Sequence, residues 1–302
     1  MTIHIIIIAN SFQARVAEAY CKKKMIGKDS IALVKLRPIR WSLDYKYLHS
    51  HFTNRPTQFI WKAFSFSINT LILKIKLNLI KKKYILIAPW HNEYLELLAG
   101  KSNCIGTYYC EEGDLSYWSD NVMFDGNDNN KKYNLARRIG PVKKWLFDKN
   151  CSGFICTSDE CFPQAEQSMK EVIELSTLDY CNVSKKGDVI GVMPSAARIT
   201  KINMVKLLRE YKKYAPQGAL NYVKIHPSFH AYPKLELELH QALKLSEFSN
   251  TEIMNENIDL ELEILANPLT LIGLDSSVER FAIKNDSNYI KVSSLLVLQS
   301  DR

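Results

Sequence analysis

Short apolar segments alternate with amphipathic segments along the whole chain. In the first half, apolar runs rich in β-branched and aromatic residues predict buried strands at Ile3–Ala9, Ser30–Lys35, Tyr84–Ala88, Cys104–Cys110 and Gly153–Thr157. Helices are predicted between them at Ala14–Lys24, Glu93–Ala99 and Pro141–Phe147, and a longer polar helix after Pro163. Because strands that alternate with helices build βαβ units, the pattern predicts an α/β fold with parallel strands.

A second series of the same kind follows the polar turn of residues 184–188, SKKGD. It predicts strands at Val189–Met193, Asn221–Ile225, Glu252–Met254 and Leu269–Gly273, with helices at Lys201–Tyr214, Lys234–Leu245 and Leu260–Ala266. The chain has 302 residues, 46% of them hydrophobic, which is enough for two domains with a core each. We therefore predict two α/β domains, residues 1–185 and residues 186–302.

The net charge of +8 is concentrated in one stretch of the first domain. Between Phe59 and Lys83 there are six lysines and no acidic residue. The longest uncharged part, Ala63–Leu73, is shorter than the roughly 20 apolar residues that cross a bilayer. Two interpretations stay open: a core helix with a lysine-rich outer end, or a basic amphipathic surface that docks on anionic lipid. We expect no nucleic-acid partner, since no nucleic-acid motif surrounds these lysines.

The cysteines indicate a reducing environment. There are seven of them, and no Cys-x-x-Cys pair. An odd number of unpaired thiols is typical of the cytoplasm rather than of a disulfide framework, and the spacing differs from that of structural zinc sites. The apolar opening, IHIIIIA, lacks the basic segment and the cleavage site of a signal peptide. We therefore expect a cytoplasmic protein.

Three short motifs lie where predicted strands end. They are Glu111–Gly113 (EEG), His226-Pro227 and Asp275–Ser277 (DSS). In open parallel sheets, ligands bind at the carboxyl ends of the strands. A carboxylate and a histidine suit acid/base chemistry there, and serines at the start of a helix can hold an anion. Each motif also has an ordinary structural interpretation: a solvated acidic turn, a histidine at a loop start, or a helix N-cap.

In this order, the three motifs resemble those of the bacterial sialyltransferases of the lipooligosaccharide, O-antigen and polysialyltransferase type. That family has an acidic pair before a glycine, a His-Pro pair and a Ser-Ser or Ser-Thr pair. Glu263–Leu265 is similar to a family segment whose glutamate holds the donor ribose, and Ala9–Gln13 is similar to the turn after the family's first strand. The resemblance implies the GT-B fold, in which two Rossmann-like domains with parallel sheets face a central cleft.

The resemblance also implies roles for the two domains and for individual residues. Residues 1–185 are expected to bind the acceptor and residues 186–302 the CMP-sugar donor. Glu112 is the expected general base, with Glu111 as the alternative, and His226 is expected to protonate the departing phosphate. Four residues are expected to bind the donor, namely Pro227, Glu263, Ser276 and Ser277.

The function implied is that of an inverting glycosyltransferase in bacterial surface glycan synthesis. It would move sialic acid, or a related nonulosonic acid, from a CMP-sugar donor to a galactoside-type acceptor. Because that donor has a single phosphate and the chain has no Asp-x-Asp motif, we expect neither a metal nor a cofactor. A lipid-linked acceptor would suit peripheral association with the cytoplasmic face of the inner membrane. Two alternatives stay open: a GT-B transferase that uses a UDP- or GDP-sugar, and a non-catalytic capsule-assembly subunit.

Overall fold

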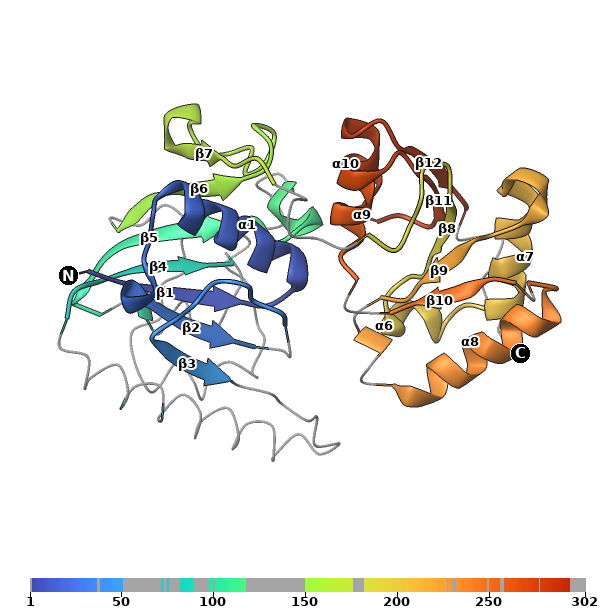
Figure 1. Cartoon of the computed structure of the whole chain (residues 1–302), viewed down its shortest axis with the longest axis horizontal. Helices are drawn as coiled ribbons and strands as arrows, with labels where there is room; N and C mark the ends of the chain where they lie inside the picture. Colours follow the sequence, from blue (N-terminus) through green and yellow to red (C-terminus); the bar gives the residue numbers. More distant parts are fainter. Residues whose placement is uncertain are drawn as a thin grey trace. The chain divides into compact units, whose positions relative to one another are not determined.

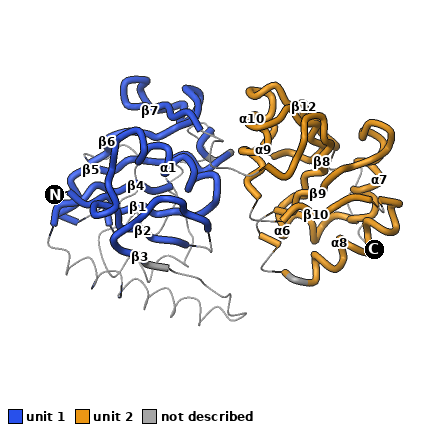
Figure 2. Tube along the Cα trace, in the orientation of Figure 1, with its two compact units in different colours: residues 1–176 blue, residues 177–302 orange. Residues whose placement is uncertain are grey.

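Two compact units make up the computed structural model, Met1–Ser176 (unit 1) and Thr177–Arg302 (unit 2; Figure 1, Figure 2). The structure describes residues 2–36, 39–50, 72, 75, 82–89, 98–99, 101–117, 150–175, 182–226, 228–229, 232–248, 250–255, 258–276 and 278–293. Each unit is built on a parallel sheet, as the sequence predicts. The assignment of acceptor and donor to the two predicted domains stays a prediction.

Unit 1 contains a seven-stranded sheet in the order β3-β2-β1-β4-β5-β6-β7. All neighbouring strands are parallel. The strands are β1 (Ile3–Ile8), β2 (Ile31–Lys35), β3 (Tyr47–Ser50), β4 (Tyr84–Ala88), β5 (Cys104–Cys110), β6 (Cys151–Cys156) and β7 (Lys170–Val172). The connections include helix α1 (Ser11–Lys23) and the 3-10 turns η1 (Lys28–Ser30), η2 (Asp114–Tyr117) and η4 (Gln167–Met169).

Strand β1 explains the isoleucine run at the start of the chain. It lies between β2 and β4, and Ile5–Ile8 are fully buried on both of its faces. Side chains alternate between the two faces of a strand, so Ile3, Ile5 and Ile7 pack together, in one core with Leu86 of β4. The continuous apolar run is therefore the signature of a central parallel strand.

Unit 2 contains a five-stranded parallel sheet in the order β10-β9-β8-β11-β12. The strands are β8 (Val189–Val192), β9 (Tyr222–Lys224), β10 (Glu252–Met254), β11 (Thr270–Gly273) and β12 (Asn288–Lys291). The helices are α6 (Ala196–Ile199), α7 (Met204–Tyr214), α8 (Pro233–Leu245), α9 (Leu260–Ala266) and α10 (Val278–Lys284), with the 3-10 turn η5 (Pro216–Gly218) before β9.

Helices cover both faces of this sheet. Leu271 and Ile272 are neighbours on β11, and their side chains point to opposite faces. Ile272 lies in one core with Leu207 of α7 and Leu239 of α8. Leu271 lies in another with Ile264 of α9. Unit 2 is thus a three-layer α/β unit, with α7 and α8 on one side and α9 and α10 on the other.

Most predicted elements of the described residues are confirmed, but the helix expected after Pro163 is wrong. That segment contains the turn η4 and the edge strand β7 instead. Phe162 and Ala165 are buried in the core of unit 1, and Ile173 N donates to Cys156 O (2.7 Å) beyond the end of the β6–β7 pairing. The open edge of β6 supplies backbone partners here, and pairing with them outweighs local helix propensity.

Three predicted segments of unit 1 lie wholly or mostly outside the described residues. They are Pro141–Phe147, the helix Glu93–Ala99 apart from residues 98 and 99, and the lysine-rich stretch Phe59–Lys83 apart from residues 72, 75, 82 and 83. Within the ranges that the structure does describe, none of the helices combines the length and apolar composition that a bilayer crossing needs. Lipid docking by Phe59–Lys83 stays a prediction.

Candidate active site

The turn after β1 is fastened to the acidic turn after β5. Asn10 caps α1, since its side-chain oxygen accepts from Gln13 N (2.8 Å), and its Nδ2 donates to the backbone oxygen of Glu112 (2.9 Å). The fully buried Gln13 side chain donates to Ile7 O (2.7 Å) and accepts from Ala9 N (2.8 Å). Both turns lie at the carboxyl edge of the parallel sheet, which is the edge that binds ligands in such folds.

Glu111 is held by donors from two other parts of unit 1. Its carboxylate accepts from Thr157 N (2.6 Å) and Thr157 Oγ1 (2.9 Å), just after β6, and from the Tyr117 hydroxyl (2.7 Å) in η2. The residue is 1% exposed. A buried carboxylate with several charge-assisted hydrogen bonds is a strong structural link. Glu111 therefore joins the ends of β5 and β6 to η2.

Glu112 has a different environment. Its Oε1 atom is buried and has no hydrogen-bond partner among the described residues. Burial raises the pKa of this carboxyl from its ordinary value of 4.5 to about 7. Gly113, at φ +114°, turns the backbone after it, and Ser116 N donates to Gly113 O (3.0 Å). A carboxyl with an unpartnered oxygen and a pKa near neutrality has the properties of a general base.

His226 follows β9 at the carboxyl edge of unit 2. Its Nδ1 accepts from the backbone N–H of Ser228 (3.1 Å) and lies 2.8 Å from the Ser228 hydroxyl. Acceptance at Nδ1 puts the hydrogen of the neutral ring on Nε2. The same hydroxyl oxygen accepts from Ala196 N (2.8 Å), which ties this turn to the start of α6 after the neighbouring strand β8. His226 is therefore fixed in one tautomer, and its ring is exposed.

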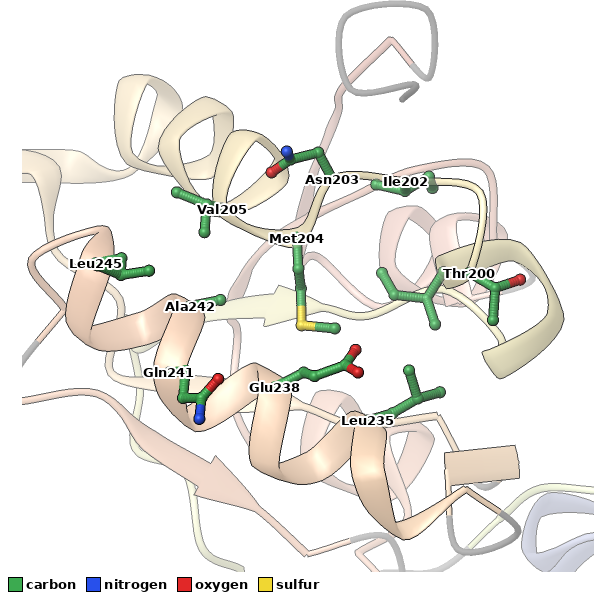
Figure 3. A pocket seen from close by; sticks show the side chains of 11 residues that line it. Thr200, Ile202, Asn203, Met204, Val205, Leu235, Glu238, Gln241, Ala242 and Leu245 are labelled. Atoms are coloured by element: carbon green, nitrogen blue, oxygen red, sulfur yellow. The ribbon is translucent and has the colours of Figure 1, made fainter. Parts of the chain in front are cut away.

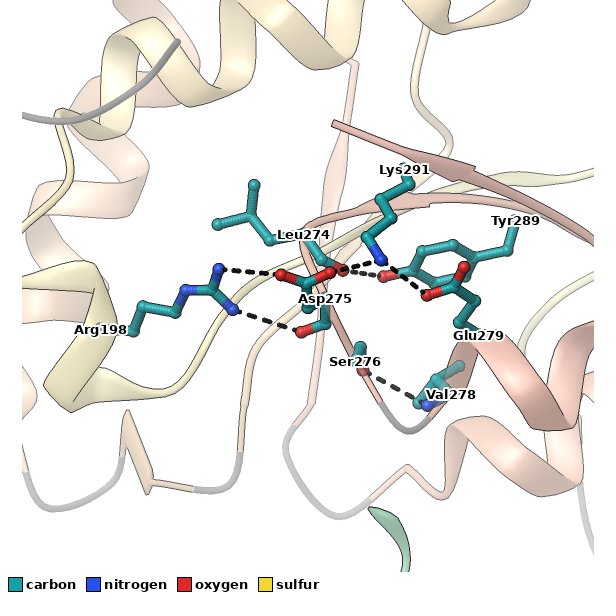
Figure 4. Close-up of polar contacts among 8 residues, drawn as sticks. All are labelled: Arg198, Leu274, Asp275, Ser276, Val278, Glu279, Tyr289 and Lys291. Carbon is teal, nitrogen blue, oxygen red and sulfur yellow. Dashed lines mark hydrogen bonds and ion pairs between the residues drawn. The ribbon is translucent and has the colours of Figure 1, made fainter. Parts of the chain in front are cut away.

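The turn after β11 carries a cluster of charges that sequence reasoning missed (Figure 4). Asp275 lies 2.5 Å from Lys291 Nζ, at the end of β12, and 3.5 Å from an Arg198 nitrogen in α6. The ion-pair hydrogen bond with Lys291 lowers the pKa of Asp275. Ser276 Oγ accepts from Val278 N (3.3 Å) at the start of α10. Two cations thus converge on Asp275, the residue before Ser276.

The Glu263 carboxylate in α9 accepts hydrogen bonds from the segment before β8. It is fully buried, and its carboxylate accepts from the backbone N–H groups of Val183 (3.0 Å) and Ser184 (2.7 Å) and from the Ser184 hydroxyl. These bonds anchor the segment that leads into β8. A ribose hydroxyl would have to share this carboxylate with them, so the expected role of Glu263 in donor binding stays a prediction.

Two predicted donor-binding residues cannot be placed, and the cavity of unit 2 lies away from the others. Pro227 and Ser277 lie outside the described residues. A cavity of about 460 Å³ lies between α8 and the α6–α7 connection, with Met204, Leu235 and Glu238 pointing into it (Figure 3). None of the predicted site residues lines it. Across the described part of the chain, no group of three or more His, Cys, Asp or Glu side chains could hold a metal.

Comparisons with known proteins identify the fold. No family model and no curated protein matches the sequence. Among solved structures, UDP-GlcNAc 2-epimerase from Methanocaldococcus jannaschii, in complex with UDP-GlcNAc and UDP, is 14% identical, and the match covers 97% of this chain and 84% of that one with a TM-score of 0.55. Anabaena HepE, in complex with UDP and glucose, is 11% identical over 96% and 80% of the two chains, with a TM-score of 0.50.

A third solved structure is the GT-B domain of a sialyltransferase from Photobacterium damselae. It is 12% identical, and the match covers 96% of this chain and 90% of that one with a TM-score of 0.50. At such identities the likeness shows the fold alone. Together with the seven-stranded and five-stranded parallel sheets, it confirms the expected GT-B fold of two Rossmann-like units.

Proposed function

We propose that this protein is an inverting, metal-independent glycosyltransferase that uses a CMP-activated nonulosonic acid such as sialic acid. The observation that carries the proposal is the Glu112 carboxyl, which has a buried, unpartnered oxygen and a pKa of about 7 at the carboxyl edge of a GT-B unit. An acid in this state can take a proton from a sugar hydroxyl near neutral pH. The order of the acidic, His-Pro and Ser-Ser motifs directs the proposal toward a sialyl-type donor.

The proposed reaction is one displacement at the anomeric carbon of the donor. The acceptor hydroxyl oxygen bonds to that carbon while Glu112 takes its proton. The bond from the carbon to the phosphate oxygen breaks, and CMP leaves with the electron pair. His226 donates its Nε2 hydrogen to a phosphate oxygen, a role that suits a ring whose Nδ1 accepts from Ser228. Ser276 and Ser277 would hold the same phosphate.

Glu111 and Glu263 have supporting roles in this proposal. Because Glu111 already accepts three hydrogen bonds, we assign the base to Glu112 and the positioning of the turn to Glu111. Because Glu263 holds the backbone before β8, a contact with the donor ribose would add to a structural role rather than replace it.

A second candidate is a GT-B enzyme that acts on a UDP-sugar. It is favoured by the likeness to the M. jannaschii epimerase and to Anabaena HepE, both solved with UDP bound. In that case Arg198 and Lys291, which lie beside Ser276 and Asp275, would face a diphosphate. The two candidates differ in the nucleotide that they bind.

A donor screen tests the proposal directly. Calorimetric titration with CMP, UDP and GDP is followed by incubation with CMP-sialic acid and several galactosides, and the products are identified by mass spectrometry. We expect CMP to bind and a sialylated galactoside to form. Binding of UDP with transfer from a UDP-sugar would favour the second candidate, and binding of none of the nucleotides would favour a non-catalytic subunit of a capsule-assembly complex. The acceptor in the cell, which we propose is a lipid-linked surface glycan, needs a separate assay.

A further inference from the structure

Lysines line the amino-terminal edge of the sheet in unit 1. In a parallel sheet, the segments that lead into the strands all lie at this edge, opposite the edge of Glu112. Four such segments, residues 22–30, 44–46, 82–83 and 101–103, precede β2, β3, β4 and β5. They contain two acidic residues, Asp29 and Asp44, and no arginine. Their eight lysines are Lys22, Lys23, Lys24, Lys28, Lys46, Lys82, Lys83 and Lys101.

Hydrogen bonds join these segments in two groups, one on each side of β1; the four segments together are here called the basic edge. Lys46 N donates to Ile31 O (3.0 Å), which joins the starts of β3 and β2. Asn103 Nδ2 donates to Lys82 O (3.2 Å), which joins the starts of β5 and β4. In the strand order β3-β2-β1-β4-β5, strand β1 lies between these two groups.

Among the described residues, most of this positive charge has no acidic partner. Lys23 and Lys24 pair with Glu171, at 3.0 Å and 2.7 Å. Five other lysines form no ion pair within the described residues, namely Lys28, Lys46, Lys82, Lys83 and Lys101. A row of solvated lysines attracts a polyanionic surface.

Apolar and aromatic side chains lie among these lysines. Met25, between Lys24 and Lys28, is 89% exposed, and Tyr45 and Tyr47 are 38% and 44% exposed. A hollow of about 310 Å³ lies beside Met25. It is lined by the apolar side chains of Met25, Ile26, Ile31 and Leu43, with Lys22 and Lys28 among its other lining residues. Exposed methionine and tyrosine with surrounding lysines are typical of a protein surface at the level of lipid headgroups.

We infer that the basic edge docks unit 1 on a bilayer of anionic phospholipid. The lysines face the headgroup phosphates, Tyr45 and Tyr47 lie at the headgroup level, and Met25 enters the outer acyl region beside the hollow. Lipid fits this surface better than nucleic acid, because arginine is the residue favoured for bidentate contacts to bases and phosphates and the basic edge has none. The exposed apolar side chain of Met25 also suits the acyl chains of lipid better than it suits a phosphate backbone.

Docking through the basic edge fixes the distance between the membrane surface and the acidic turn that carries Glu112. Strand β5 has seven residues, which corresponds to roughly 23 Å between the basic edge and the acidic turn. Glu112 would therefore work well above the headgroups. Resting on the proposed glycosyltransferase function, this orientation selects acceptors that extend several sugars from their lipid rather than a sugar next to it.

The test is sedimentation of the full-length protein with vesicles. One set contains phosphatidylcholine alone, and the other contains equal parts of phosphatidylcholine and phosphatidylglycerol. The triple variant Lys28→Gln, Lys82→Gln, Lys83→Gln removes charge from the basic edge. The single variant Met25→Asn removes the apolar tip and keeps the fold, because asparagine tolerates the positive φ of this position (51°) better than methionine does.

The matched control changes three exposed lysines of unit 2, Lys185, Lys201 and Lys206, to glutamine, and so removes the same net charge. We expect binding to the anionic vesicles only, weakened by salt. At about fivefold per lysine, the edge triple variant should bind roughly a hundredfold more weakly. Met25→Asn should bind several-fold more weakly, and the control should bind within about threefold of the wild type.

Three results would overturn the inference. One is an absence of preference for the anionic vesicles, and another is equal loss in the edge triple variant and in the control. The third is unchanged lipid binding by Met25→Asn together with displacement of the protein from vesicles by duplex DNA, which would identify a nucleic-acid surface. Transfer to a soluble galactoside should stay unchanged in all variants, so a failure of docking is distinguishable from a failure of the proposed function.

Discussion

Replacement of Glu112 by glutamine should abolish transfer and, at alkaline pH, stabilise the protein. Burial raises the pKa of this carboxyl from 4.5 to about 7 in the folded state. That difference corresponds to about 3 kcal/mol between the two protonation states. Since the folded protein holds this proton more tightly than the unfolded chain does, the free energy of unfolding falls as the pH rises from about 4.5 to about 7, and then levels off. Glu112→Gln removes this fall.

Two measurements follow from this. Urea unfolding at about pH 4.5 and about pH 8 should show the wild type losing up to about 3 kcal/mol more than Glu112→Gln between the two values. The comparison between pH values cancels differences in packing between carboxyl and amide. In the wild type, kcat/KM should rise with pH and level off above an apparent pKa near 7, since the base must be unprotonated. The variant should retain about a hundredth of the activity or less.

Glu111→Gln is the matched control, because the same chemical change is made one residue away. An amide there replaces an oxygen that accepts from Thr157 or Tyr117 with a donor, so this variant should lose about 1–3 kcal/mol of stability. In this variant, kcat/KM should still rise with pH and level off above an apparent pKa near 7. Two results would refute the reasoning. One is a rise of kcat/KM near pH 7 that persists in Glu112→Gln, and the other is a free energy of unfolding of this variant that falls with pH as steeply as that of the wild type.

Three further predictions concern the other parts of the proposed site. His226→Ala should reduce kcat about a hundredfold or more with little change in the melting temperature, since the ring is exposed; steady-state kinetics and calorimetry test both, and near-normal kcat would remove His226 from the mechanism. Transfer should persist in excess EDTA, and a loss restored by manganese would favour a UDP-sugar donor. Gly113→Ala should cost about 1–2 kcal/mol in urea unfolding, because a φ of +114° strains any residue with a Cβ, and an unchanged midpoint would show that the turn adapts.

Central strands were predictable from the sequence, whereas of the edge strands in the described residues only β10 was, at Glu252–Met254. Strands β1, β4 and β5 lie inside their sheet, and their apolar runs gave almost the observed bounds. Strands β3, β7 and β12 lie at the sheet edges, where one side needs no apolar cover, and their sequences YLHS, KEV and NYIK lack a buried run. The mistaken helix after Pro163 has the same origin, since pairing with β6 determined its structure.

The position of the acidic motif at the end of a strand was predictable from the sequence, while the roles of Glu111 and Glu112 depend on tertiary contacts. Sequence gives two adjacent glutamates before a glycine at a strand end. It does not say that Thr157, which is 46 residues away, and Tyr117 donate to one of them. Thr157 comes to Glu111 because β6 pairs beside β5, and Tyr117 comes to it in η2, the turn after β5. Glu112 is left as the acid with an unpartnered oxygen. The assignment of the base therefore follows from strand order.

The same argument accounts for Arg198 and Lys291. Neither residue belongs to a recognisable motif, and they are separated from Asp275 by 77 and 16 residues. Strands β8 and β12 flank β11, so the segments that follow or end these strands meet at Asp275. In a parallel sheet, residues at the carboxyl ends of neighbouring strands become a cluster whatever their distance in sequence. A search along the chain for strand-end cations, made after the strand order is known, would have found both, and it identifies them as the residues to compare when the donor nucleotide has been identified.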